Sequence, residues 1–354
     1  MKNNYRKLGD YIQPVDVRNS DLKVSHLLGV SVEKRFIESI ANTIGTDFSK
    51  YKIVRRGQFT YIPDTSRRGD KIGIALLTEF DEGLVSNIYT VFEITDTTKL
   101  LPEYLMLWFS RPEFDRYSRY KSHGSVREIF DWDEMCRVEL PIPDLKEQKK
   151  IVNTYNAITK RIQLKQKINE NLEKTAQTIY RKMFVEDADE KWETVKLEKV
   201  IEVRYGKDHK NLEKGNIPVY GSGGIMRYAN KYLYDKESVM IPRKGSLNNI
   251  IYTDEPFWSV DTMFYTSMKK QNFAKYFYEF IRTKDFLNLD TGSAVPSMTT
   301  DYLNNIEILN PDNTTLEKFE SKVSRLYISK QNNYKEIFKL QELKQLVISR
   351  ISGM

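Results

Sequence analysis

The sequence predicts an α+β protein with two similar mixed α/β domains, each followed by a long helix, and with the two helices forming an antiparallel coiled coil. Three observations support this fold class. The chain of 354 residues repeats short motifs at a constant offset. Each copy contains short β-rich runs and one apolar helix. Each copy is also followed by a long segment whose apolar residues recur at alternating spacings of four and three.

The repeat is clearest where each copy ends. His123-Gly124-Ser125-Val126 recurs as Thr291-Gly292-Ser293-Ala294, an offset of 168 residues (292 − 124). The same offset relates three further pairs, which are Asp133 and Asp301, Glu139 and Glu307, and Pro143-Asp144 and Pro311-Asp312. A constant offset indicates an internal duplication. We therefore expect a first domain over residues 1–145, a central helix and linker over 146–190, a second domain over 191–314 and a C-terminal helix over 315–354.

The first domain is predicted to be rich in strands. Runs of β-branched and aromatic residues separated by turn-forming residues predict strands at 52–54, 59–62, 73–77 and 88–94. A helix is expected over 102–109, because Pro102 stands at its first position and Leu105, Trp108 and Phe109 share one face. A last strand precedes the Pro141-Ile142-Pro143 break.

The second domain repeats this plan in a shorter form. Strands are predicted at 238–241, 249–252 and 262–265, and a helix over 273–281. From Leu8 to Gly124 is 116 residues, whereas from Leu197 to Gly292 is 95, so the second copy is 21 residues shorter (116 − 95). The two copies therefore share a scaffold but differ in their loops. Because loops usually carry recognition, we expect the two domains to recognise different things.

The two long segments carry the apolar seam of a coiled coil. The residues expected at this seam are Ile151, Tyr155, Ile158, Ile162, Leu172 and Ile179 in the first segment and Leu316, Phe319, Val323, Leu326, Ile337, Leu340 and Val347 in the second. Lys165 and Asn169 interrupt the first seam, and Lys330 and Asn333 interrupt the second. In antiparallel helices these polar positions can meet and fix the register. A helix of 38 residues is roughly 57 Å long, so the pair would act as a spacer.

Composition excludes several classes of protein. The hydrophobic fraction of 40% and charged fraction of 30% are ordinary for a globular protein. No apolar run is long enough to span a membrane, and the polar N-terminus lacks the apolar region of a secretory signal. The single cysteine, Cys136, excludes an intrachain disulfide and suits a reducing cytoplasm, where we expect the protein. The histidines at 26, 123 and 209 match no zinc-ligand spacing, so no metal site is expected.

The net charge of +7 and the pI of about 9.0 are typical of proteins that bind nucleic acid, although a merely basic surface explains the charge equally well. Basic residues gather in predicted loops, beside small residues that form hydrogen bonds. The candidate DNA-binding residues are Arg55, Arg56, Arg67, Arg68, Lys71, Ser125 and Arg127 in the first domain and Arg204, Lys207, Arg227, Arg243, Lys244, Asn248, Asn249 and Ser293 in the second. For any one of them, a solvated surface role is the alternative. As a set repeated in both domains, they favour reading of DNA, because arginine suits guanine, asparagine suits adenine, and serine and lysine suit phosphates.

A search for catalytic motifs finds none that holds together. The chain has no phosphate-binding P-loop, no GxSxG elbow and no HExxH pair. The Gly-rich run at 220–224 fits a turn between strands better than a phosphate cradle. Asn310-Pro311-Asp312-Asn313 does not match the signature of adenine methyltransferases, and Pro143-Asp144 lies too far from the acidic pair near Lys191 to suggest a nuclease. His123 is interpreted as an exposed loop residue. We therefore expect neither catalytic residues nor a cofactor site in this chain.

Several stretches together resemble the specificity subunit of Type I restriction–modification systems, the HsdS family, over essentially the whole length. In the first domain the matching stretches are SNIYTVF at 86–92, GSVR at 124–127, and LPIP at 140–143 leading to EQKKI at 147–151. In the second they are IPVYGSGG at 217–224, IPRKGS at 241–246 and FWSVDT at 257–262. The end of the second domain departs from this pattern, because Pro311-Asp312 is not followed by a Glu-Gln pair as Pro143-Asp144 is.

The resemblance implies a non-catalytic protein with two target-recognition domains. Each would read one half of a bipartite, asymmetric site in double-stranded DNA, and the paired helices would set the unread spacer. It also implies two methyltransferase subunits, which bring S-adenosylmethionine and methylate adenine, and two motor–nuclease subunits, which use ATP and Mg²⁺. Three alternatives remain at this point. They are a methyltransferase or nuclease with an unrecognised motif, a coiled-coil scaffold without a DNA role, and the specificity subunit of another multi-subunit restriction system.

Overall fold

The structure is a computed structural model that describes residues 5–39, 45–65, 71–124, 128–286 and 298–351. The chain forms two compact units. Unit 1 comprises Met1–Leu164 and Glu336–Met354, and unit 2 comprises Lys165–Lys335. The units therefore divide within the two long helices, whereas the domain boundaries expected from the sequence lie at the helix ends.

Unit 1 is built on a four-stranded antiparallel sheet with the order β2-β9-β6-β7. Its strands are β2 (Ile12–Val15), β9 (Thr90–Ile94), β6 (Phe59–Tyr61) and β7 (Ile74–Leu76). Two separate two-stranded antiparallel sheets accompany it, β3 (Leu28–Val30) with β4 (Phe36–Glu38) and β5 (Lys52–Arg55) with β8 (Glu82–Val85). Three helices follow, α1 (Pro102–Phe109), α2 (Pro112–Tyr120) and α3 (Trp132–Arg137), and β10 (Glu139–Pro141) then pairs with β1 (Tyr5–Lys7). Short 3-10 turns occupy Leu8–Asp10 and Phe48–Lys50. The core lies between the sheet and α1, where Phe59 and Phe92 stack with ring centroids 4.9 Å apart.

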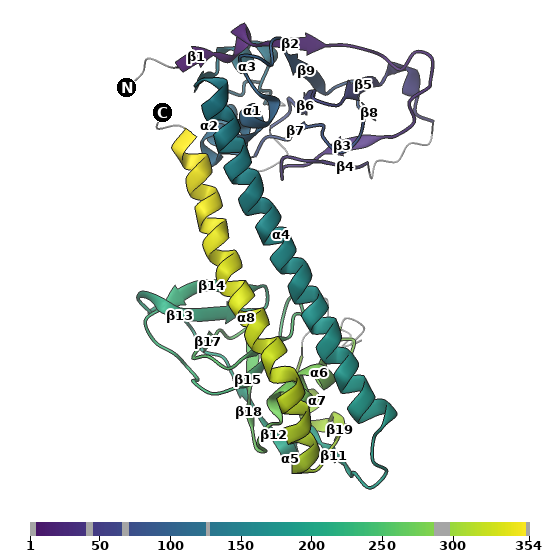
Figure 1. The fold of residues 1–354 in the computed structure, drawn as a ribbon, viewed down its shortest axis with the longest axis vertical. Helices are drawn as coiled ribbons and strands as arrows, with labels where there is room; N and C mark the ends of the chain where they lie inside the picture. The colour runs from purple at the N-terminus through teal and green to yellow at the C-terminus, as the bar shows by residue number, and fades with distance from the viewer. Residues whose placement is uncertain (1–4, 40–44, 66–70, 125–127, 287–297, 352–354) are drawn as a thin grey trace. The chain divides into compact units, whose positions relative to one another are not determined.

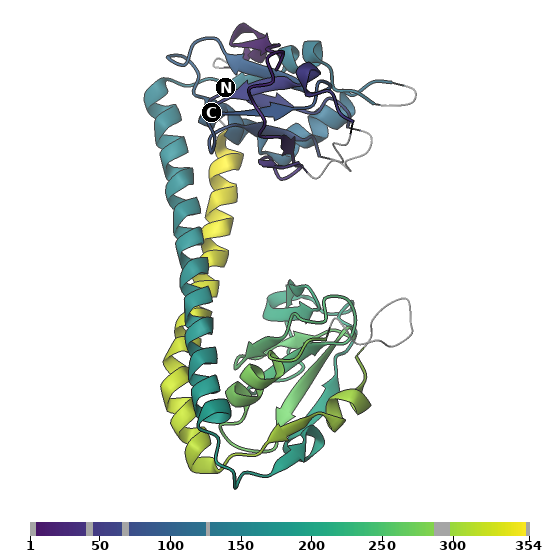
Figure 2. The ribbon, with the colours of Figure 1, turned by 90° about the vertical axis from the view of Figure 1, so that its right-hand side faces the viewer.

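Unit 2 is built on a sheet of the same kind, with the order β12-β18-β15-β16. Its strands are β12 (Ile201–Tyr205), β18 (Met263–Met268), β15 (Ser238–Pro242) and β16 (Ile251–Thr253). A second sheet joins β13 (Lys214–Gly221), β14 (Gly224–Ala229) and β17 (Trp258–Ser259), and β11 (Thr194–Lys196) pairs with β19 (Glu307–Leu309). The helices are α5 (Leu197–Val200), α6 (Ala274–Ile281) and α7 (Thr300–Asn305). Helix α6 lies between the sheet and the long helices (Figure 2), and Tyr276 and Phe277 are core residues there.

The internal duplication predicted from the sequence is confirmed by equivalent contacts in the two units. Asp131 and Thr299, which are 168 residues apart, each cap the short helix that follows, by accepting a hydrogen bond from a backbone N–H. The offset also holds for the starts of β10 and β19 and for the starts of the two long helices. Tyr104 donates its hydroxyl hydrogen bond to the carbonyl of Pro141 in β10, as Tyr276 does to that of Leu309 in β19. The chain therefore uses one scaffold twice.

The long helices are α4 (Leu145–Arg181), which ends in a π-helical turn at Lys182–Glu186, and α8 (Asn313–Arg350). Within each unit the α4 and α8 segments run side by side in opposite directions (Figures 1 and 2), so the predicted antiparallel pairing is confirmed. In unit 1, Ile158 and Ile162 of α4 pack against Ile337 of α8, with Leu340 and Val347 beside them.

Other seam residues pack against the domain cores as well. In unit 1, Ile151 and Tyr155 belong to the core cluster of the sheet and α1. In unit 2, Leu316, Phe319 and Val323 are fully buried in the main core, with Leu326 and Ile179 packed against it, while Leu172 is half-buried on α4. The first part of each helix thus completes the core of the domain that precedes it.

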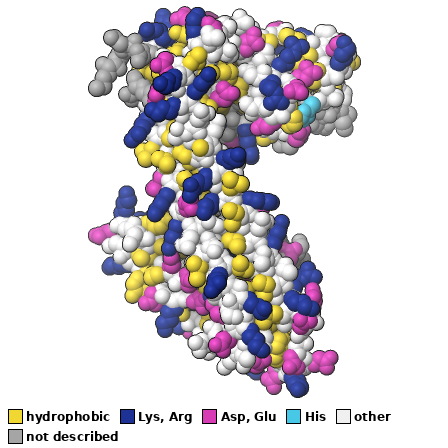
Figure 3. All heavy atoms as spheres, viewed as in Figure 1, with side chains coloured by type: hydrophobic (Ala, Val, Ile, Leu, Met, Phe, Trp, Pro, Cys, Tyr) yellow, Lys and Arg dark blue, Asp and Glu magenta, His cyan; other side chains and the backbone are white. Residues whose placement is uncertain are grey.

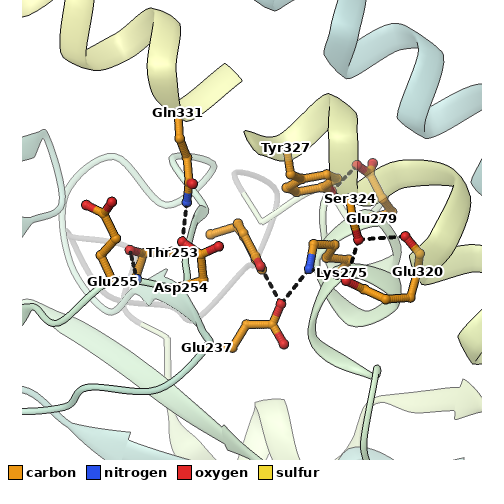
Figure 4. Close-up of polar contacts among 11 residues, drawn as sticks. Glu237, Thr253, Asp254, Glu255, Lys275, Glu279, Glu320, Ser324, Tyr327 and Gln331 are labelled. Atoms are coloured by element: carbon orange, nitrogen blue, oxygen red, sulfur yellow. Dashed lines mark hydrogen bonds and ion pairs between the residues drawn. The ribbon is translucent and has the colours of Figure 1, made fainter. Parts of the chain in front are cut away.

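A polar network joins the body of unit 2 to α8 (Figure 4). Lys275 of α6 lies between Glu237 and Glu320, with its ammonium nitrogen 2.7 Å from an oxygen of each. Burial alone would lower the pKa of Lys275, but the two carboxylates outweigh burial and raise it. Tyr327 of α8 donates a hydrogen bond of 2.5 Å to Glu279, whose pKa burial raises. The helix is therefore fixed to its domain by buried charges as well as by apolar packing.

None of the helices in the described part of the chain combines the length and the apolar character that a membrane crossing requires.

Candidate nucleic-acid interface

The carboxyl ends of β12 and β15 lie at one end of the unit 2 sheet, on either side of the first residues of β18. Strand β12 ends at Tyr205, and Arg243 follows the last residue of β15. The backbone N–H of Arg243 donates to the carbonyl of Thr262, and that of Lys207 donates to the carbonyl of Ser259, both at 2.8 Å. Two sequence-predicted basic residues are thus brought together beside an exposed aromatic residue, although they are far apart in the sequence.

The loop that follows Arg243 is fixed by its own polar side chains. Gly245 has a φ of +84°, in the left-handed region that favours glycine. The side-chain amide of Asn249 donates to the carbonyl of Ser222 at the tip of the β13–β14 hairpin, at 2.8 Å. The side-chain oxygen of Asn248 accepts a hydrogen bond of 3.1 Å from the N–H of Phe286. Each of these two candidate adenine readers therefore uses one end of its amide within the protein. The Gly-rich run forms the predicted turn between strands.

Both units make the same hydrogen bond at this end of their sheets. In unit 2 the N–H of Met298 donates to the carbonyl of Arg243, and in unit 1 the N–H of Phe130 donates to the carbonyl of Pro63, each at 2.9 Å. Phe130 and Met298 are 168 residues apart. The loop after β15 in unit 2, or after β6 in unit 1, is thus bonded to the segment before α7 or α3. The duplication includes this surface.

In unit 1 the two loop segments that carry the basic and Gly-Ser motifs are bonded to one another. Thr65 donates its N–H to the carbonyl of Glu128 at 3.0 Å and its hydroxyl to Ser122 at 2.8 Å. His123, which is exposed as the sequence predicted, exchanges two backbone hydrogen bonds with Ile129. The residues that border 66–70 and 125–127 therefore lie together. The candidates that fall outside the described residues are Arg67, Arg68, Ser125, Arg127 and Ser293.

Four candidate basic residues form ion pairs within the protein. These pairs are Arg55 with Glu82 at 3.8 Å, Arg56 with Asp81 at 3.0 Å, Lys71 with Glu33 at 3.0 Å and Arg204 with Glu202 at 2.6 Å. Arg55 and Arg56 precede β6, so they lie at the opposite end of that strand from Thr65. The guanidinium of Arg204 lowers the pKa of Glu202. Exposed pairs of this kind are weak, because water and dissolved salt screen their charges.

Arg227 supports the protein's own backbone. Its guanidinium donates to the carbonyls of His209 and Leu212, the second at 3.0 Å. These bonds hold the loop between β12 and β13, and they favour a structural role over a contact with DNA.

Two features of this surface were missed in the sequence. Tyr205 is 53% exposed, and Ile225 and Met226 are 50% and 57% exposed at the end of the β13–β14 hairpin. An aromatic residue directly before Gly206-Lys207 was the available signal for Tyr205. Its importance depends on the long-range pairing of β12 with β18, which the sequence pattern does not reveal.

The described residues contain no group of three or more His, Cys, Asp or Glu side chains that is arranged to hold a metal ion. The surface offers hydrogen-bond donors, amides and aromatic faces. These are groups that recognise phosphates and the edges of bases.

Comparison with known families agrees with this arrangement. The family model described as "Type I restriction modification DNA specificity domain" matches residues 2–174 and again 189–335. The chain belongs to this family of Type I restriction–modification specificity subunits. The two matches correspond to the two copies of the internal repeat, and together they include every described residue of the surface discussed above.

Two specificity subunits and one solved structure are similar to this member of the family. The MjaIX subunit of Methanocaldococcus jannaschii is 24% identical over 296 residues, which is 71% of this chain and 68% of that protein. The HindI subunit of Haemophilus influenzae is 26% identical over 137 residues, or 38% of this chain and 29% of that protein. The crystal structure of the S subunit from M. genitalium has a TM-score of 0.62 at 15% identity, covering 98% of this chain and 95% of that one. The structural similarity shows that the fold is shared.

Proposed function

We propose that this chain is the non-catalytic DNA-specificity subunit of a Type I restriction–modification complex in the cytoplasm. Each domain reads one half of a bipartite, asymmetric site. The observation that carries the proposal is the duplicated sheet end, where Phe130 in unit 1 and Met298 in unit 2 make the same hydrogen bond beneath different loops. The same scaffold with different loops is what two different half-sites require. The net charge of +7 supports attraction to the phosphate backbone.

The paired helices set the length of the unread spacer between the half-sites. Support comes from their extent, since α4 contains 37 residues and α8 contains 38, and each contributes to both units. Arg161 and Glu336 join the helices in unit 1 with an ion pair of 2.5 Å. This pair adds to the apolar contacts of Ile158 and Ile162 with Ile337 in the same unit.

The helices also dock the partner subunits, which are two methyltransferase and two motor–nuclease subunits. Apolar side chains lie at the surface of both helices, interspersed with lysine and arginine (Figure 3). The exposed ones are Leu164 and Ile168 of α4 and Ile328, Tyr334, Phe338, Leu343 and Leu346 of α8. Such residues on a long helix are typical of a surface that binds another protein. The partners bring the chemistry, with S-adenosylmethionine for adenine methylation and with ATP and Mg²⁺ for translocation and cleavage.

The proposal is tested by assembling the chain with its methyltransferase partner and sequencing the methylated DNA by a single-molecule method. The expected motif has two short specified halves separated by an unspecified spacer. Replacing residues 1–145 with the corresponding domain of another specificity subunit should change one half only. One continuous short motif, or methylation by the isolated chain with S-adenosylmethionine, would contradict the proposal.

The role of the helices is tested by inserting one heptad into both α4 and α8. Seven residues lengthen a helix by roughly 10 Å, which is about three base pairs of DNA. The spacer should lengthen while both half-sites stay the same. A spacer that keeps its length would show that the helices do not measure it.

A further inference from the structure

The candidate arginines differ in whether an acidic group neutralises them. Arg55, Arg56 and Arg204 each have a carboxylate within ion-pair distance. Arg227 donates to backbone carbonyls. Arg243 forms no ion pair with a carboxylate of the described residues, and its side chain is partly exposed directly after β15. None of these carboxylates therefore neutralises its charge.

The guanidinium of Arg243 is held in one orientation from two sides. Its central carbon lies 5.5 Å from the centroid of the Tyr205 ring, within the range of a cation–π interaction. One of its terminal nitrogens donates to the backbone carbonyl of Asp261 at 3.2 Å. These contacts come from the end of β12 and from the residues just before β18, the strand that lies between β12 and β15.

Tyr205 is itself a fixed support, although it is half exposed. Its ring meets the ring of Phe264 at an interplanar angle of 71°, with centroids 5.0 Å apart. Phe264 is fully buried and pairs directly with Tyr205 across the β12–β18 ladder. The tyrosine therefore rests on the core and presents an immobile ring to the arginine.

The chemistry of arginine indicates what such an arrangement recognises. A guanidinium carries five N–H donors. The carbonyl of Asp261 accepts a hydrogen bond from one nitrogen of the Arg243 guanidinium, so further donors stay available. Two parallel donors of the planar group match the O6 and N7 acceptors of guanine in the major groove, which is the commonest specific contact between proteins and DNA. A phosphate contact needs less fixed orientation, because a lysine also binds phosphate, as a point charge.

We infer that Arg243 reads a guanine in the half-site recognised by unit 2, and that Tyr205 and the carbonyl of Asp261 are its positioning groups. The inference rests on the proposed function and adds to it one named reader and one base. Lys199 is the control, because it is an exposed basic residue of α5 directly before β12 and so lies at the opposite end of that strand from Tyr205.

The test uses the full chain assembled with its methyltransferase partner, and the readout is the methylated motif of each variant. With Arg243→Ala or Arg243→Lys, preference for guanine at one position of the second half-site should fall on the order of 10- to 100-fold, while the first half stays unchanged. Lys199→Ala should leave both halves unchanged. Arg243→Lys keeps the positive charge but lacks the two parallel donors of the guanidinium. It therefore separates the loss of these donors from the loss of the charge. It also replaces the alanine variant if that variant fails to fold.

The tyrosine is tested in the same way. Tyr205→Phe keeps the ring and should keep the guanine preference, whereas Tyr205→Leu should reduce it in the same position as the arginine variants do. If Tyr205 had only a structural role, its loss would weaken the base preference at every position of the half-site. A loss at the same single position as in the arginine variants therefore indicates that Tyr205 positions Arg243.

Three results would overturn the inference. The first is an unchanged motif with Arg243→Ala. The second is a second half-site without a G·C pair. The third is an equal loss of binding on all sequences with a salt dependence reduced by about one unit, which marks a phosphate contact. If the wild-type complex produced no bipartite motif, the proposed function itself would fail, so the two failures are distinguishable.

Discussion

The ammonium group of Lys165 in α4 donates a hydrogen bond of 2.8 Å to the side-chain oxygen of Asn333 in α8, and the two residues are 168 positions apart. They are therefore equivalent positions of the two repeats. The amide of Asn333 in turn donates to Asn169 at 2.8 Å, and both asparagines are buried. Buried polar groups that bond to one another across two helices favour the register in which they meet.

Replacing Asn333 with leucine should lower the free energy of unfolding by roughly 1–3 kcal/mol, because the buried amide of Asn169 loses its donor. The lost stability is measured by urea denaturation, as a lower midpoint with an unchanged slope. Asn332 is exposed on the same turn of α8 and is the matched control. Its leucine variant should unfold within about 0.5 kcal/mol of the wild type. Equal midpoints for the two variants would show that the cluster does not stabilise the pair.

The meeting of these polar residues was predictable because helical periodicity is local. The spacing of four and three places Asn169 and Asn333 in the two seams whatever the rest of the chain does. The partner of Lys330 was not predictable. Its ammonium group lies 2.7 Å from Glu173, a residue outside the seam pattern, and Arg282 of unit 2 joins the same carboxylate. Which ion pair forms depends on how the body of the unit packs on both helices.

Glu173 should make the stability of unit 2 depend on pH. Burial raises its pKa, but Lys330 and Arg282 together outweigh burial, so the pKa lies below the ordinary value of a glutamate. A carboxyl group with a lowered pKa stabilises the fold above its unfolded pKa, and this stabilisation is lost as pH falls through the folded value. Glu173→Gln should therefore unfold more easily by roughly 1–3 kcal/mol at pH 7. Below about pH 4 it should approach the wild type.

The control for this prediction is Glu170→Gln on the same helix. Glu170 is largely exposed and pairs with Lys167 at 3.0 Å, so its variant should change stability by less than about 1 kcal/mol at any pH. Denaturation midpoints across the pH range measure both variants. A constant difference between Glu173→Gln and the wild type from pH 7 to pH 3 would contradict the assigned ion pairs.

Tyr104→Phe and Tyr276→Phe should destabilise their units by similar amounts. Each hydroxyl donates to the carbonyl of an equivalent strand, at 2.9 Å in unit 1 and 2.8 Å in unit 2, and each ring is fully buried. Loss of one such bond costs roughly 0.5–1.5 kcal/mol. Tyr120 is 82% exposed, so Tyr120→Phe serves as the control and should unfold like the wild type. A large effect in one unit and none in the other would show that the two hydroxyls have different roles.

The candidate DNA-binding surface was only partly predictable from the sequence. The basic residues at 207, 243 and 244 could be selected because they fall in predicted loops, and Arg243 and Lys244 precede small residues that form hydrogen bonds. The sequence could not show which arginines are neutralised by a carboxylate. Glu82 reaches Arg55 across the pairing of two strands, and Glu202 reaches Arg204 from two residues earlier on the same strand. The role of Tyr205 depends on β18 lying between β12 and β15. That order is set by long-range pairing and not by local pattern.

Gly206 tests how closely the end of β12 must approach the neighbouring chain. A Cβ at this position would lie far inside the van der Waals distance of the backbone carbonyl of Val260, and a backbone atom cannot move aside as a flexible side chain can. Gly206→Ala should therefore lower stability by roughly 1–3 kcal/mol. It should also displace Tyr205 and Lys207, so that binding of the assembled complex to its DNA site weakens.

Gly223 in the hairpin turn has nothing within 4 Å of such a Cβ, and Gly223→Ala should leave stability within about 0.5 kcal/mol of the wild type. Denaturation midpoints and DNA binding of the two variants measure the difference. If Gly206→Ala bound DNA and unfolded as Gly223→Ala does, the close approach would not hold the reading surface in place.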